Sequence, residues 1–329
     1  MDFLQEYGLF LAKTLTLLAA LLIAITALAR LARASKPHIG GDSLIRVEHL
    51  NRRYEKAALL LNSAMLSGKA ARAARKALAR REKSGPDSTR HRLYVIDFEG
   101  DLRASSVGAL RDEITAILTA ARDSDEVLVR LESPGGLVHS YGLAASQLMR
   151  IRDRGLKLTV AVDKIAASGG YLMACVGHRI LAAPFAIIGS IGVVAQLPNF
   201  NRLLKRHDID FEQFTAGEHK RTVTLFGKNT QAGREKLQRE IEHVHTLFKA
   251  FIAENRPRLD IERVATGEYW HGTRALEFQL VDELRTSDDY LLEAAREAEI
   301  FRVHSTRPKP LLARLISQAA ASLRQFSLR

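Results

Sequence analysis

The chain has 329 residues, of which 47% are hydrophobic, and a formal net charge of +12 at pH 7. This length can bury a large core without covalent staples, and the lone Cys175 excludes an intrachain disulfide framework. A basic excess can serve nucleic-acid binding, but no aromatic platform or nucleic-acid module accompanies it, so we expect no nucleic-acid partner.

A long apolar run opens the chain. Residues 8–29 are apolar except for Lys13 and three threonines, which is long enough to cross a bilayer. A cleavable signal peptide is the alternative, because Ala27-Leu28-Ala29 resembles a cleavage site. Acidic Asp2 and Glu6 precede the run, so we favour an uncleaved, single-pass membrane anchor over residues 1–35.

Residues 36–90 predict a basic helical region next to the membrane, ending in a Ser-Gly-Pro-Asp-Ser linker at 84–88. Its alanine-, arginine- and lysine-rich stretch is either a solvated helix or a segment attracted to anionic headgroups. Membrane lipid is therefore an expected partner. The basic residues that follow the apolar run favour a cytoplasmic position for the rest of the chain.

Strand and helix patterns alternate from residue 91 to residue 300. Short β-branched runs predict strands, and apolar residues at spacings of three and four predict helices. The strands are expected at 93–98, 127–131, 158–162 and 187–194, and helices at 107–121 and 231–255. This alternation is typical of an α/β domain with mostly parallel strands. Residues 301–329 form a tail whose 311–326 stretch predicts a short amphipathic basic helix.

Two glycine-rich turns follow two of these strands. Ser168 lies in Ala-Ala-Ser-Gly-Gly-Tyr, between a short apolar run and a predicted helix. Backbone N–H groups and the helix dipole favour negative charge there, as a nucleophile that builds an oxyanion requires. The alternative is a serine that only caps the helix. Ser133-Pro134-Gly135-Gly136 could supply further N–H donors, or could be an ordinary turn.

Together with Ile180-Leu181-Ala182-Ala183-Pro184 and Gly189-Ser190-Ile191-Gly192-Val193, these turns resemble the signal peptide peptidase A family of serine proteases. Asp97-Phe98-Glu99-Gly100-Asp101 and the apolar N-terminus make the SohB branch the nearest match. The resemblance implies a crotonase/Clp-like ββα spiral fold, homo-oligomers, no cofactor or metal, and a place in the bacterial inner membrane. It also implies cleavage of peptides such as signal-peptide remnants or membrane-protein segments. Relatives commonly work on the outer side, so sidedness stays open.

The family's site residues map onto this sequence. Ser168 would be the nucleophile and Lys220, in Gly217-Glu218-His219-Lys220, the general base, with one protomer holding both. Ser190 would hydrogen-bond the lysine, and the backbone N–H groups of Gly136 and Gly169 would form the oxyanion hole. A lysine lodged in an apolar pocket is pushed toward its neutral form and can accept the serine proton. The alternatives are a solvated lysine at 220 and a serine at 190 that bonds a nearby carbonyl.

Other functions of the same fold remain alternatives. A Ser-His-Asp triad of the Clp kind is disfavoured, because residues 185–200 contain no histidine and we interpret His178 as structural. A crotonase-like acyl-CoA enzyme would need carboxylates, and Glu132 is the obvious one near a glycine turn. A non-catalytic membrane scaffold is the third possibility. We expect Cys175 to be a small buried packing residue.

Overall fold

A computed structural model describes residues 7–11, 13–18, 44–65, 68–70, 72–74, 76, 79, 86, 87, 89–217, 220 and 222–306. The chain divides into two compact units, 1–42 and 43–329. Within the described residues, none of the helices combines the length and apolar character needed to cross a membrane. Most of the predicted anchor lies outside the described residues, and so does the tail beyond residue 306.

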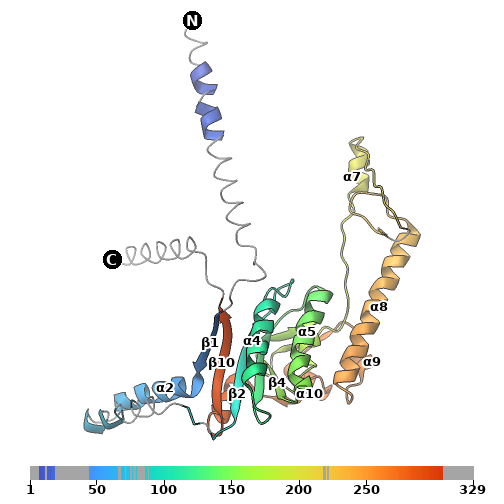
Figure 1. Ribbon diagram of the computed structural model, residues 1–329. Helices are drawn as coiled ribbons and strands as arrows, with labels where there is room; N and C mark the ends of the chain where they lie inside the picture. The colour runs from blue at the N-terminus through green and yellow to red at the C-terminus, as the bar shows by residue number, and fades with distance from the viewer. Residues whose placement is uncertain are drawn as a thin grey trace. The chain divides into compact units, whose positions relative to one another are not determined.

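A seven-stranded sheet organises the second unit (Figure 1). Its strands, in spatial order, are β1 (Leu44–His49), β10 (Glu299–Thr306), β2 (Arg92–Glu99), β3 (Glu126–Glu132), β4 (Lys157–Val162), β6 (Arg179–Ala182) and β9 (Glu283–Leu284). All neighbouring pairs are parallel except β1 with β10. The predicted α/β class with mostly parallel strands is therefore confirmed, whereas the finer spiral assignment stays a prediction.

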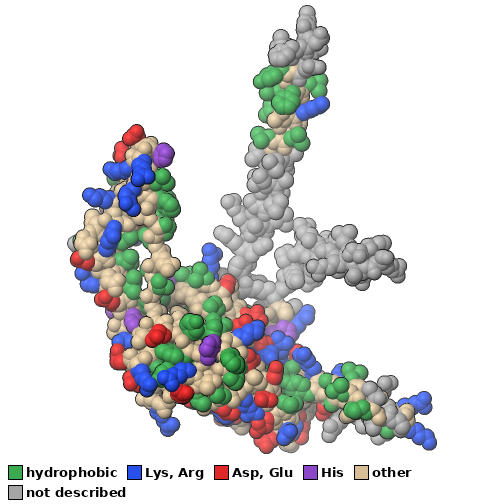
Figure 2. Space-filling model, turned by 180° about the vertical axis from the view of Figure 1, so that it is seen from behind, with side chains coloured by type: hydrophobic (Ala, Val, Ile, Leu, Met, Phe, Trp, Pro, Cys, Tyr) green, Lys and Arg blue, Asp and Glu red, His purple; other side chains and the backbone are tan. Residues whose placement is uncertain are grey.

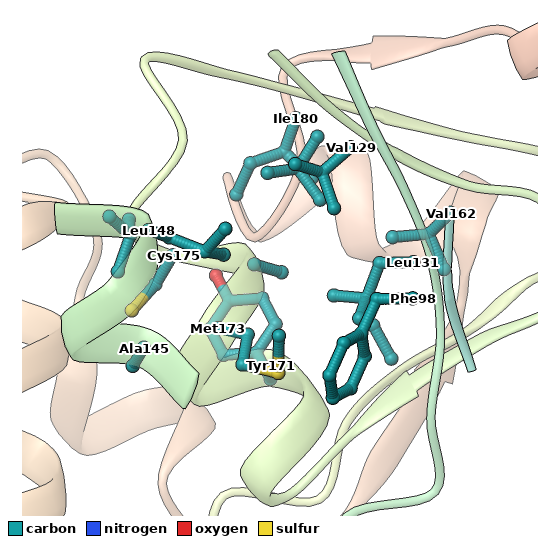
Figure 3. Packing of buried hydrophobic residues seen from close by; sticks show 14 of the residues in the cluster. Phe98, Val129, Leu131, Ala145, Leu148, Val162, Tyr171, Met173, Cys175 and Ile180 are labelled. Carbon is teal, nitrogen blue, oxygen red and sulfur yellow. The ribbon is translucent and has the colours of Figure 1, made fainter. Parts of the chain in front are cut away.

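Helices cover both faces of this sheet. One face packs against α4 (Val107–Ala120), α5 (Val138–Asp153) and α6 (Gly169–Ala174), and the other against α2 (Leu50–Met65) and α11 (Ser287–Ala294). Alternate residues of β2 divide between the two cores, Ile96 to the first and Val95 to the second, because successive side chains of a strand point to opposite faces. Figure 3 shows the first core, where Tyr171 of α6 packs among Phe98, Leu131 and Met173.

A second, three-stranded sheet carries the serine motifs. It consists of β5 (Ile165–Ala167), β7 (Ile187–Gly189) and β8 (Tyr269–His271). β5 and β7 are parallel, with Ala167 opposite Gly189, and β8 is antiparallel to β7. The two sheets meet at the end of β3, where Ser133 forms an isolated parallel bridge with Ala166.

The remaining helices follow β7. They are α7 (Asn201–Arg206), α8 (Gln231–Asn255), α9 (Ile261–Val264) and α10 (Gly272–Glu277). The segment between β7 and α8, residues 190–230, carries α7 away from the sheets (Figure 1). Thr230 caps α8 by accepting a hydrogen bond from the Gly233 N–H, as its residue type favours.

Three boundaries differ from the sequence prediction. Residues 44–49, expected within a helical region, form strand β1 instead, because their partner β10 supplies a ladder that the local sequence does not reveal. β10 runs on to Thr306, past the domain boundary placed at residue 300. The strand expected over 187–194 ends at Gly189, since Gly189 and Ser190 both take positive φ angles (105° and 52°) and turn the chain out of the sheet.

Candidate active site

Ser168 occupies a sharp turn between β5 and α6, as its motif predicted. Its backbone has φ 52° and ψ −118°, a combination that side-chain-bearing residues rarely adopt. Its hydroxyl makes no capping bond to α6 and has no hydrogen-bond partner among the described residues. The capping alternative is therefore not supported. A serine on a strained strand-to-helix turn presents its oxygen outward, which is the geometry of a nucleophile elbow.

Close contacts around Ser168 explain the glycines of both motifs. A Cβ built on Gly135 would lie 2.8 Å from the Ser168 Cβ and 2.8 Å from the Gly169 nitrogen. The backbone of Gly135 also has a positive φ of 88°. A Cβ on Gly169 would overlap the ring of Tyr141 on α5. The Ser-Pro-Gly-Gly turn thus lies directly against the turn that holds the serine, and only glycine allows this approach.

Two backbone N–H groups beside Ser168 are free to bind a ligand. Gly169 is the first residue of α6, and the first N–H groups of a helix lack intrahelical acceptors. Neither the Gly169 N–H nor the Gly136 N–H donates to another described residue. The Ser168 N–H, in contrast, is used, because it donates to the Gly189 carbonyl at 2.7 Å. Both N–H groups thus lack an acceptor among the described residues, which is a property that oxyanion-hole donors require.

Ser190 lies at the same end of the small sheet as Ser168. Each serine directly follows one member of the paired residues Ala167 and Gly189. The Ser190 N–H donates to the Glu268 carbonyl at 2.6 Å, whereas its hydroxyl bonds no other described group. The alternative in which the Ser190 hydroxyl bonds a nearby carbonyl does not occur in this arrangement.

Lys220 lies apart from this cluster. It is exposed in the segment between α7 and α8, and its backbone N–H donates to the Gly217 carbonyl at 3.1 Å. Among the described residues, no hydrogen bond or ion pair joins its side chain to Ser168 or Ser190. The structure thus brings together Ser168, Ser190, Gly136 and Gly169 but not Lys220.

Other ionisable groups near Ser168 are paired or buried. Lys164, four positions before Ser168, pairs with Glu132 at 2.8 Å, and this hydrogen bond and charge raise its pKa. His178 accepts the Leu158 N–H at 3.0 Å, which confirms its structural role, and burial lowers its pKa. Cys175 is fully buried and burial raises its pKa, so the thiol is a packing residue as predicted.

A charged cleft of about 270 Å³ lies at the carboxyl ends of β2, β3 and β4. Its centre is Asp97, which accepts hydrogen bonds from Arg130 and Arg302 at 2.6 Å each. Burial by itself would raise the pKa of Asp97, but the two guanidinium groups outweigh it and hold the pKa below its usual value. Because its central charges are matched inside the protein, we interpret the cleft as a structural ion cluster.

Two family profiles together match most of the chain. The profile described as peptidase family S49 N-terminal matches residues 2–148, and that of peptidase family S49 matches residues 150–300. A "Probable protease SohB" of Haemophilus influenzae is 46% identical, covering 98% of this chain and 94% of the relative. The chain therefore belongs to peptidase family S49. The resemblance inferred from the motifs is thereby confirmed.

Other S49 relatives match a smaller part of the chain. A "Probable protease SohB" of Buchnera aphidicola subsp. Acyrthosiphon pisum is 54% identical over 74% of this chain and 72% of its own length. "Protease 4" of Haemophilus influenzae is 27% identical over 65% of this chain and 36% of the relative. These names support a protease.

Tyr141 is the member of this site that sequence reasoning missed. Its Oη lies 2.6 Å from the Ser133 Oγ in the glycine turn. The available signal was spacing, because a tyrosine one turn into the helix that follows Ser-Pro-Gly-Gly can reach back to that turn.

Proposed function

We propose that this S49 peptidase is a membrane-associated serine endopeptidase in which Ser168 is the nucleophile and Lys220 the general base. The observation that carries the proposal is the strained, unbonded Ser168 beside two free backbone donors. Strain of this kind persists where the surroundings impose it, and it concentrates at functional sites. An ordinary helix cap requires neither the strain nor the donors.

The proposed reaction follows from this geometry. The Ser168 Oγ attacks a peptide carbonyl carbon, and its proton passes to the neutral amine of Lys220. The carbonyl oxygen becomes negative and accepts hydrogen bonds from the Gly136 and Gly169 N–H groups. Collapse breaks the C–N bond, and Lys220 returns the proton to the leaving amine. Water then attacks the acyl-enzyme by the same steps and releases the acid.

Lys220 must leave water for this role, since a lysine amine in water is protonated at neutral pH. The segment around it exposes apolar side chains that a monomer would not be expected to leave uncovered (Figure 2). They are Phe200, Leu203, Phe211, Phe214, Leu225 and Phe226. We therefore include homo-oligomerisation in the proposal, with a second copy covering this segment and desolvating Lys220.

The oligomer can be tested by light scattering after size-exclusion chromatography. Phe214 is 89% exposed, so Phe214→Asp should reduce both assembly and active-site labelling. Leu292→Asp on α11 is the matched control, because Leu292 is 57% exposed on another element. A wild-type monomer that is fully active would contradict this part of the proposal.

Apolar side chains flank the proposed oxyanion hole. Leu102 is 68% exposed and Leu137 is 42% exposed, and the Leu137 N–H donates to the Leu102 carbonyl at 2.9 Å beside Gly136. An extended substrate would place its side chains against these residues. We therefore propose substrates with small or apolar residues before the scissile bond, such as remnant signal peptides or membrane-protein segments.

The membrane part of the proposal rests on two features. The first is the apolar run over residues 8–29, of which residues 12 and 19–29 lie outside the described residues. In addition, α2 exposes Leu60, Leu61 and Met65 to at least 70%, and basic residues follow it (Figure 2). Apolar and basic side chains together suit an anionic bilayer surface. Fractionation should place the protein in the bacterial inner membrane, and recovery in the soluble fraction would contradict this.

A fluorophosphonate probe tests the enzyme. The wild-type protein should be labelled, Ser168→Ala should not, and Lys220→Ala should be labelled far more slowly. Ser146→Ala on α5 and Lys205→Ala on α7 are matched exposed controls that should behave as wild type. A folded wild-type protein without labelling would refute the proposal, and binding of acyl-CoA by that protein would favour a crotonase-like enzyme over a scaffold.

A further inference from the structure

A chain of hydrogen bonds links helix α5 to the glycine turn. The Tyr141 Oη donates to the Asp101 carbonyl at 2.8 Å, and the Ser133 Oγ lies 2.6 Å from the same Oη. Because tyrosine has one hydroxyl proton, which goes to Asp101, the Ser133 hydroxyl must donate to the tyrosine. The Ser133 Oγ in turn accepts the Gly135 N–H at 3.1 Å.

The two side chains of this network are fully buried, since both Ser133 and Tyr141 are 0% exposed. Buried hydroxyls without partners are costly, so the network holds one arrangement. The Ser133 N–H also donates to the Ile165 carbonyl at 2.8 Å, and the Ala167 N–H donates to the Ser133 carbonyl at 3.0 Å. The residue before the glycine turn is thus fixed both to α5 and to the strand that carries Ser168.

Tyr141 contacts Gly169 directly and is linked to the turn that carries Gly136 through Ser133. Its ring lies under Gly169, where a Cβ would overlap it. Its hydroxyl, through Ser133 and Gly135, sets the turn from which the Gly136 N–H projects. Gly136 itself lies against the Leu102 carbonyl, one residue beyond the carbonyl that accepts the tyrosine proton.

We propose that Tyr141 is a positioning residue that aligns the Gly136 and Gly169 N–H groups for the developing oxyanion, with Ser133 as its intermediary. This inference rests on the proposed function and deepens it. Tyr141 does not touch the substrate. It acts by holding the two backbone N–H donors where both can reach the oxyanion of the tetrahedral intermediate. The position of these donors matters more in the transition state than in the ground state, because the negative charge on the oxygen develops there.

The test compares Tyr141→Phe, Ser133→Ala and the double variant with wild type. Tyr141→Phe keeps the ring under Gly169 and removes only the hydroxyl. Loss of one oxyanion donor lowers kcat by about 10²–10³, so a misaligned donor should lower kcat at least about 10-fold, with KM changed less than about twofold. Because the two residues form one chain, the double variant should be no worse than the poorer single variant.

The inhibition constant of a peptide aldehyde is a second measurement, and a defect in folding alone would not change it. Its adduct with Ser168 carries an oxyanion, so its inhibition constant should rise by the same factor as kcat falls. Tyr290→Phe is the matched control, because it removes another tyrosine hydroxyl that bonds Glu126 at 3.2 Å elsewhere in the fold. It should leave both values unchanged. Equal kcat and aldehyde affinity in Tyr141→Phe and wild type would overturn the inference.

Hydrogen–deuterium exchange separates this inference from the proposed function. In the wild type the Gly135 N–H should exchange slowly, and both Tyr141→Phe and Ser133→Ala should accelerate it while Tyr290→Phe does not. This accelerated exchange in a protein without Ser168-dependent activity would refute the peptidase mechanism but support the alignment. Unchanged exchange in Tyr141→Phe would refute the alignment whatever the activity.

Discussion

Replacing Ser168 by glycine should stabilise the protein while abolishing its activity. At φ 52° and ψ −118° the Cβ of Ser168 is strained, and such conformations cost about 1–3 kcal/mol. Glycine adopts this region without the penalty, but it loses about 0.5–1 kcal/mol more chain entropy on folding than alanine. The difference predicts a net gain of about 1 kcal/mol in the free energy of unfolding. The lost hydroxyl adds no cost, since it bonds no other described group.

Ser168→Ala is the matched variant, because it removes the same hydroxyl and keeps the strained Cβ. Urea denaturation followed by circular dichroism should show a higher midpoint for Ser168→Gly than for Ser168→Ala, at equal slope. Both variants should be inactive toward the fluorophosphonate probe. A glycine variant no more stable than the alanine variant would show that the turn is not strained, and the main argument for a nucleophile would then be lost.

Three further predictions concern the fold. Burial raises the pKa of Glu113 to about 7 from 4.5, so the folded state favours the protonated carboxyl. The protonated Glu113 therefore contributes its full stability below about pH 4.5, and this contribution is lost as pH rises through about 7. Glu113→Gln should therefore gain up to about 3 kcal/mol at pH 8 and nothing at pH 4, measured by urea denaturation; equal effects at both pH values would contradict this. Cys175 should resist iodoacetamide until the protein unfolds; labelling of the native state would show that α6 opens. Asn51→Ala should cost about 1–3 kcal/mol, because Asn51 bonds the Ala298 carbonyl and the Ile300 N–H, whereas exposed Asn62→Ala should cost nothing measurable.

The sheet core and the serine turn could be read from the sequence because each depends on local pattern. The predicted ends of β3 and β4 lie within one residue of the observed ends, since mostly apolar runs of that length are typical of buried parallel strands. The helix over residues 231–255 has the predicted ends, because its apolar stripe is regular. Ser168 could be placed between a strand and a helix because alanines end the strand before it and two glycines begin the helix after it.

Features that depend on distant partners could not be predicted. β1 pairs with β10 from the other end of the chain, so the sequence near Leu44 does not by itself predict a strand. The contact between Tyr141 and Ser133 arises only when α5 packs back on its own connecting turn. Lys220 was assigned by motif, and the motif does not say what surrounds the amine. Its environment depends on the neighbours of the segment after β7, which the local sequence does not specify.

The strain at Ser168 can persist because bonds on both sides fix the peptide that carries it. Before the serine, the Ala167 N–H is held by the Ser133 carbonyl at 3.0 Å, and the Ser168 N–H by the Gly189 carbonyl at 2.7 Å. After it, the Ser168 carbonyl accepts the Leu172 N–H at 3.0 Å in the first turn of α6. Relaxing φ would break at least one of these buried bonds, each worth about 1 kcal/mol net. Their sum is comparable to the strain, so this local balance keeps the strained turn and leaves the Ser168 hydroxyl without a hydrogen-bond partner among the described residues.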